Sequence, residues 1–252
     1  MMVFTCNDNL TDIFTCIYDA WEYALKNGHD SIRLEKEPVM QLSIFDEYRH
    51  INGDQEKSTK VERSIKRKIS VKAYNRIAYA AMSCEPGCLN IIYDYLRLGF
   101  KRGAEVTEDL TEPVVIRIIE ISRNVANEAH FSREFVRFNK VSGAYVSHYE
   151  PKNNIILYAG EHFADRMPSE NFMIIDDKRH MAVIHPKNEG LYVRNFTEEE
   201  FESLKETEQY KDEYTDLWKI FFDAIAIRER TNYICQRGHF PLWMRKHVTE
   251  FN

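Results

Sequence analysis

Five of the nine histidines fall within a stretch of 56 residues in the second half of the chain, and two adjacent aspartates lie among them. The histidines are His130, His148, His162, His180 and His185, and the aspartates are Asp176 and Asp177. Imidazole and carboxylate are ligands that zinc or iron prefers, and histidine is the usual acid–base group at neutral pH. No two histidines show the close spacing of a helical metal-binding pair, so we predict no metal. The cluster then forms a metal-free polar site or supplies polar side chains to a small sheet.

Cys84 and Cys88 are separated by three residues that include Pro86 and Gly87. Two thiols at this spacing suit a redox pair, or half of a metal site shared with a partner. The alternative is that both are small residues packed around a break between helices, which the Pro-Gly pair favours. The five cysteines are odd in number and scattered, unlike a secreted disulfide framework, so we expect a reduced, cytoplasmic setting.

The segment 57–72 is strongly basic, with seven Lys or Arg residues against Glu62 alone. Lys60, Arg63 and Arg67 share one face if the segment is helical. Such a face is either simply solvated or contacts phosphates. The candidate phosphate contacts of this segment are Lys60, Arg63, Lys66 and Arg67.

A second basic segment, 225–252, interleaves cations with aromatic rings. Stacked rings and cations together suit a single-stranded or flipped base. The alternative is a tail that the same rings clamp against the core. The candidate nucleic-acid contacts of this tail are Arg228, Arg237, Trp243, Arg245 and Lys246.

The net charge of -6 argues against a chain coated with positive charge for binding nucleic acid without specificity. That charge is uneven, however, because 197–216 carries nine acids against two lysines. A local basic surface is therefore compatible with the acidic average. No Gly-rich phosphate loop, serine-nucleophile elbow or dinucleotide fingerprint is present, and no cofactor is predicted.

Glycine and proline total only 16 residues, so helices are favoured. Apolar periodicity predicts helices over 10–26, 59–84 and from Pro113 onward. Short aromatic and β-branched runs between 134 and 196 predict strands joined by hairpin turns at Ser142-Gly143 and Asn188-Glu189-Gly190. A capping box formed by Thr197 and Glu200 predicts the start of an acidic helix. We expect a helix-rich α+β fold with one small antiparallel sheet in the second half. The expected division is a helical part, 1–110, and an α+β part, 111–252, or one continuous domain.

The segment TNYICQRGHFPLWMRKHVTEF, 231–251, resembles the closing segment of a bacterial family of DNA-metabolism or DNA-repair proteins. ANEAHFSREFVRFNKVSGAYVSHYEP, 126–151, and LYAGEHFADRM followed by FMIIDDKRH, 157–180, are similar to the same family. Members of that family resemble companions of a radical SAM protein, and some are similar to segments fused to uracil-DNA glycosylase-like domains. The resemblance implies an accessory or enzymatic role in DNA repair or modification.

The chain departs from the radical SAM enzymes themselves. Their iron–sulfur cluster needs Cys-x3-Cys-x2-Cys, whereas Cys84 and Cys88 are followed by Ile91. The resemblance thus implies the companion of a radical SAM protein and not that enzyme.

The sequence is compatible with three hypotheses of function. The first is a DNA repair or modification accessory protein that contacts DNA, single-stranded or damaged, and works with a radical SAM partner. The second is a metal-independent glycosylase-like or nuclease-like enzyme, and the third is a pure interaction scaffold. Because His130 and His162 lie in the family-like segments, they and Asp176 are the candidate catalytic residues, with Arg137 and Arg166 as phosphate contacts. No stretch is long and apolar enough for a membrane helix, so no membrane partner is expected.

Overall fold

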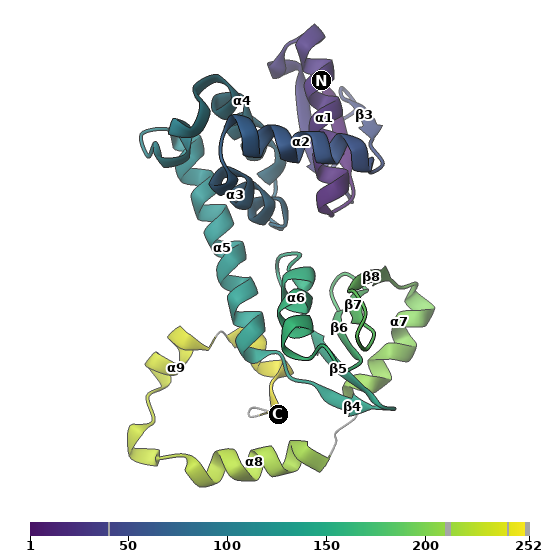
Figure 1. Cartoon of the computed structure of the whole chain (residues 1–252), viewed down its shortest axis with the longest axis vertical. Helices are drawn as coiled ribbons and strands as arrows, with labels where there is room; N and C mark the ends of the chain where they lie inside the picture. The colour runs from purple at the N-terminus through teal and green to yellow at the C-terminus, as the bar shows by residue number, and fades with distance from the viewer. Residues whose placement is uncertain (40, 210–212, 241, 250–252) are drawn as a thin grey trace. The chain divides into compact units, whose positions relative to one another are not determined.

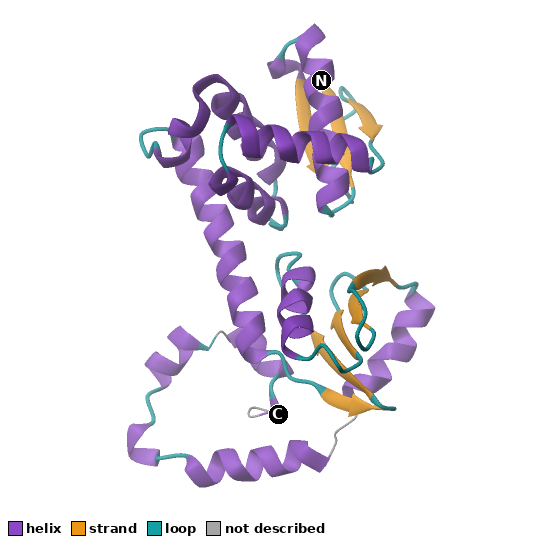
Figure 2. Cartoon of the chain, viewed as in Figure 1, coloured by secondary structure: helices purple, strands orange, loops and turns teal. Residues whose placement is uncertain are grey.

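The computed structural model describes residues 1–39, 41–209, 213–240 and 242–249 (Figure 1). The chain forms two compact units, which we call the first unit (1–127 with 152–154) and the second unit (128–151 with 155–252). The long helix α5, Pro113–Phe135, contributes residues to both units. Each unit contains its own sheet, whose strands are orange in Figure 2.

The first unit contains a three-stranded parallel sheet in the order β2-β1-β3. Its strands are β1 (Met2–Cys6), β2 (Ile32–Lys36) and β3 (Glu47–His50). Helix α1, Leu10–Asn27, connects β1 to β2, and such a crossover leads to a parallel pair. The α+β class is confirmed, but the prediction of a single sheet confined to the second half was wrong. The missed strand β3 is exposed and polar, so it lacks the apolar alternation that marks a strand.

Besides a 3₁₀ turn at His29–Ser31, four further helical segments belong to the first unit together with the start of α5. They are α2 (Gln55–Lys68), α3 (Val71–Ala81), α4 (Cys88–Arg102) and a 3₁₀ turn at Gly103–Glu108. The single helix predicted over 59–84 is therefore two helices. The backbone leaves helical geometry at Ile69, and the Ser70 side chain accepts a hydrogen bond from the Ala73 amide at 3.0 Å. A serine hydroxyl that accepts from the backbone in this way begins a new helix, so α3 is separate from α2.

Helices α1, α2 and α4 pack through buried aliphatic side chains. Ile17 of α1, Ile65 of α2 and Leu96 of α4 are all buried. Gly99 brings α4 close to the end of α2, because a Cβ at this position would lie 2.5 Å from Ile69 Cδ1. This packing fixes how the three helices present their outer faces.

The second unit contains a five-stranded mixed sheet in the order β4-β5-β6-β7-β8. Its strands are β4 (Asn139–Val141), β5 (Ala144–Tyr149), β6 (Phe172–Asp176), β7 (Met181–His185) and β8 (Tyr192–Asn195). All neighbours are antiparallel except β5 and β6, which are joined by helix α6, Ile156–Arg166, and pair in parallel. The expected hairpins at 142–143 and 188–190 are confirmed, whereas the expectation of a wholly antiparallel sheet was wrong because of this crossover.

The remaining helices follow the sheet in the chain. They are α7 (Glu198–Lys205), α8 (Glu213–Ile225), α9 (Tyr233–His239), and 3₁₀ turns at Glu206–Gln209, Arg228–Arg230 and Leu242–His247. The predicted Thr197–Glu200 capping box begins α7. Among the described helices, none has the length and apolarity that a bilayer crossing requires.

Candidate nucleic-acid interface

Helix α2 carries the first basic segment, and its start is fixed by Asp54. The Asp54 side chain accepts hydrogen bonds from the amides of Lys57 and Glu56, and these bonds lower the pKa of its carboxyl group. The Asp54 amide also donates to Thr15 Oγ1 of α1 at 2.9 Å. The cap and this contact set the rotation of α2 against α1, so they determine which side chains of α2 face solvent.

The cations of α2 differ in whether a carboxylate already neutralises them. Lys57 contacts Asp19 at 2.6 Å, Lys60 contacts Glu56 at 2.6 Å, and Lys66 contacts Glu62 at 2.5 Å. Arg63 and Arg67 are exposed, and neither forms an ion pair with any carboxylate that the structure describes. Two arginine side chains therefore remain available on this helix.

Lys60, Arg63 and Arg67 form one continuous face, which we call the basic ridge. At 3.6 residues per turn, the three side chains lie within about 60° of one another. Lys66 lies about 120° from Lys60 on the same count, and its amine sits 4.0 Å from the centre of the Tyr74 ring. Lys60, Arg63 and Arg67 thus share one face of α2 as expected from the sequence, whereas Lys66 lies beyond Arg63, on the side away from Lys60, and is already paired with Glu62.

An aromatic cleft of about 340 Å³ lies beside the basic ridge, between α1, α2 and α4. Tyr18, Trp21 and Phe100 supply its rings, and the Trp21 and Phe100 planes meet at 88° with centroids 5.3 Å apart. Lys60 and Lys68 line the α2 side, and the Lys68 amine is 5.6 Å from the Phe100 ring centre. Lys60 therefore belongs to both the ridge and the cleft.

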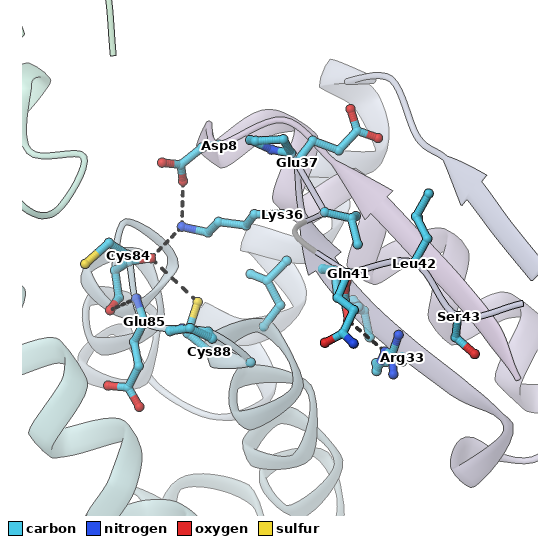
Figure 3. Close-up of a pocket in the computed structure, with 18 of the residues that line it drawn as sticks. Asp8, Arg33, Lys36, Glu37, Gln41, Leu42, Ser43, Cys84, Glu85 and Cys88 are labelled. Atoms are coloured by element: carbon cyan, nitrogen blue, oxygen red, sulfur yellow. Dashed lines mark hydrogen bonds and ion pairs between the residues drawn. The ribbon is translucent and has the colours of Figure 1, made fainter. Parts of the chain in front are cut away.

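A second cavity of the first unit, about 840 Å³, lies at the carboxyl ends of β1 and β2 (Figure 3). The Lys36 amine reaches Asp8 Oδ1 at 2.5 Å and the Ser83 carbonyl oxygen at 2.8 Å. Cys84 and Cys88 both line this cavity, and their sulfur atoms point in different directions. Cys84 is exposed, whereas burial raises the pKa of the Cys88 thiol to about 11. Cys88 therefore stays protonated at neutral pH and is a poor nucleophile.

The three candidate catalytic residues of the second unit occupy different environments. His130 is exposed and lies 3.1 Å from Glu134. Asp176 is fully buried, and burial raises its pKa, although Arg179 Nη1 donates to it at 2.8 Å. The described hydrogen bonds of Asp176 come from Arg179 and the Lys178 amide, so this carboxylate is held by its own turn.

His162 is the candidate that lies among other cations. Its pKa is lowered by partial burial and then by the neighbouring Arg133 and Arg166. Arg166 follows His162 by one helical turn, and Arg133 comes from α5. Arg133 was not among the residues predicted for the site, although it lies three residues after His130 and so shares a helix face with it.

The structure also shows a buried arrangement that the sequence did not predict. His148 Nδ1 lies 2.8 Å from Asp177 Oδ1, and His148 Nε2 lies 2.8 Å from Thr207 Oγ1. The Thr207 hydroxyl also donates to the Leu204 carbonyl oxygen at 2.6 Å. Both ring nitrogens of His148 are engaged by these contacts, and the arrangement clamps the segment after α7 onto β5.

The remaining candidate nucleic-acid contacts lie in different environments. Trp243 packs against Phe240, Met244 and Val248. The Arg245 guanidinium lies 5.7 Å from the Phe240 ring centre, and Arg237 is exposed on α9. Arg137 donates to the Glu134 carbonyl oxygen at 2.9 Å. The side chains of Arg228 and Lys246 lie outside the described residues.

Within residues 1–39, 41–209, 213–240 and 242–249, which the structure describes, no group of three or more His, Cys, Asp or Glu side chains is placed to hold a metal ion.

Comparison with known proteins places most of the chain in one family. The family model described as a domain of unknown function, DUF4130, matches residues 86–250, which is more than half of the chain. The chain therefore belongs to this family. Neither a curated protein nor a solved structure gives a significant match.

Proposed function

We propose that this chain is an accessory protein of DNA repair or modification that contacts nucleic acid through its first unit and works with a radical SAM protein. The observation that supports the nucleic-acid contact is the pair of exposed arginines, Arg63 and Arg67, which no described carboxylate neutralises. The repair setting and the radical SAM partner are proposed from the sequence resemblance. No cofactor is included in this proposal.

The basic ridge has the chemistry that a phosphodiester backbone requires. An arginine guanidinium presents several N–H donors in a planar fork that matches two phosphate oxygens. Arg63 and Arg67 would bind phosphate without first breaking an ion pair. Lys60 would exchange Glu56 for phosphate at little cost, because an exposed pair of this kind contributes about 1 kcal/mol or less.

The acidic average charge of the chain does not describe this local surface. The -6 net charge is an average over the chain, and nine of its acids belong to 197–216 in the second unit. At physiological ionic strength, interactions between exposed charges are largely screened beyond about 8 Å. A phosphate at the ridge therefore responds mainly to the neighbouring side chains of α2.

Fluorescence anisotropy with a labelled single-stranded oligonucleotide at low salt tests this proposal. The charge-reversal variant Arg63→Glu/Arg67→Glu is expected to bind roughly tenfold more weakly than the unmodified chain, because two phosphate contacts are lost. The matched control is Arg49→Glu/Arg123→Glu, which changes net charge equally on exposed residues of β3 and α5. Absence of binding by the unmodified chain, or equal weakening in both variants, would contradict the proposal.

The partner and the catalytic alternative need separate measurements. A pull-down with the purified radical SAM protein is expected to retain this chain in the absence of DNA. Capture without any DNA shift would support the scaffold alternative. A DNA-directed activity that is abolished by both His130→Ala and His162→Ala would support the enzyme alternative.

A further inference from the structure

We propose that the aromatic cleft is a binding site for one unstacked nucleobase, so that the first unit prefers single-stranded or extrahelical nucleotides to a paired duplex. This inference rests on the proposed nucleic-acid contact and adds the class of ligand. It starts from two observations that are independent of the ridge. The cleft has three half-buried rings, and its volume of about 340 Å³ remains open between packed helices.

The ring geometry of the cleft suits a flat aromatic ligand. Trp21 and Phe100 meet at 88°, so a planar base can stack on one ring while its edge meets the face of the other. Trp21 is held by a second ring, since Tyr93 lies 5.3 Å away. The Trp21 wall is therefore already positioned before any ligand arrives, which limits the entropy lost on binding.

The cleft also has side chains that favour a nucleotide over a purely apolar ligand. Lys60 and Lys68 line one side, and Glu22 and Ser64 add an acceptor and a hydroxyl group. Cationic amines near aromatic rings attract the phosphate while the base stacks. A carboxylate and a hydroxyl can hydrogen-bond to the polar edge of a base.

The distance from the cleft to the ridge matches adjacent nucleotides of one strand. Lys60 lies at the cleft, and Arg67 is about 10 Å further along the helix axis at 1.5 Å per residue. Successive phosphates of a stacked strand rise by about 3.4 Å, so the ridge covers roughly three of them. One strand can thus place its phosphates on Lys60, Arg63 and Arg67 while a base enters the cleft. A base inside a duplex would first have to leave the stack, at a cost of a few kcal/mol.

The test compares three fluorescent probes of equal length: an oligothymidylate strand, a strand of abasic sugar-phosphate units, and a duplex. We expect the unmodified chain to bind oligothymidylate about tenfold or more tightly than the abasic strand, from the stacking of one base. Trp21→Leu, which removes one wall, is expected to reduce this ratio toward one. Ser64→Phe, which fills the cleft from α2, is expected to do the same, whereas Ser64→Ala keeps the ratio.

The variants distinguish whether base binding in the cleft or phosphate binding on the basic ridge is wrong. Arg63→Glu/Arg67→Glu is expected to weaken both single strands and to keep their ratio. Equal affinity of the unmodified chain for the oligothymidylate and abasic strands would overturn the cleft inference and leave the ridge contact standing. No binding of any probe at low salt would overturn both. Circular dichroism of each variant checks its folding, and the two cleft variants act by opposite changes of volume.

Discussion

Replacement of Gly160 by alanine should destabilise the second unit, although alanine normally favours a helix. Gly160 lies on α6 where this helix packs on β7. An added Cβ would lie 2.7 and 2.8 Å from the two γ-methyl groups of Val183, which is fully buried. A β-branched side chain cannot swing its methyl groups aside. Overpacking costs about 1–3 kcal/mol, while the helix gains roughly 1 kcal/mol from Gly→Ala, so we expect a net loss of up to about 2 kcal/mol.

Urea unfolding followed by far-UV circular dichroism measures this loss, and hydrogen exchange in β6 and β7 assigns it to the second unit. Gly238→Ala is the matched control, because Gly238 also lies in a helix and a Cβ there meets nothing within 4 Å. The control should be neutral or stabilising by up to about 1 kcal/mol. The double variant Gly160→Ala/Val183→Ala should show a favourable coupling of about 1–3 kcal/mol, since the clash is gone. A stabilising Gly160→Ala, or no coupling, would refute the reasoning.

Three further predictions concern the clamp, a histidine pair and the ridge. His148→Ala should lower the opening free energy that hydrogen exchange measures for β5 amides by about 2–4 kcal/mol, because Asp177 loses a buried partner. Thr207→Val should lower the same free energy by only about 1 kcal/mol. In an NMR titration, the His50 pKa should lie above the ordinary 6.5 because of its hydrogen bond to Glu37, and Glu37→Gln should lower it. The His50–Glu37 pair should therefore stabilise the fold fully between pH 4.5 and 6.5. This effect is lost as pH rises through the raised His50 pKa or falls through the lowered Glu37 pKa. Finally, the three cations of the ridge predict a slope of about −2 when log affinity for a single strand is plotted against log salt concentration. In Arg63→Glu/Arg67→Glu the slope should be about 1.4 shallower. An unchanged slope, unchanged protection or a His50 pKa at or below its ordinary value would contradict the respective prediction.

Local patterns in the sequence predict many elements of the fold, but not how the strands pair. The apolar stripe of 10–26 predicts α1, and the Ser142-Gly143 turn predicts the β4–β5 hairpin. The parallel pairing of β5 with β6 depends on α6 crossing the sheet, which no local pattern records. The break between α2 and α3 could have been predicted, because Ser70 followed by a helix-forming run is a typical capping residue.

In the candidate interface, too, the sequence predicts what lies on one helix but not what several helices bring together. The ridge follows from the spacing of Lys60, Arg63 and Arg67 on one helix. The cleft does not, because Trp21 and Phe100 are far apart in sequence and only the packing of α1, α2 and α4 brings their rings within 5.3 Å. The clamp between His148 and Thr207 joins β5 to a 3₁₀ turn 59 residues later, so its partners had no common motif.

Photochemical cross-linking of an oligothymidylate strand, followed by mass spectrometry of the peptides, locates the nucleic-acid contact on the chain. The strand should cross-link to peptides of α1 and α2 that contain Trp21 and the basic ridge. Arg63→Glu/Arg67→Glu should reduce these adducts, while Arg49→Glu/Arg123→Glu should not. Adducts confined to the second unit, or adducts on α2 that survive the ridge variant, would contradict the proposed nucleic-acid contact.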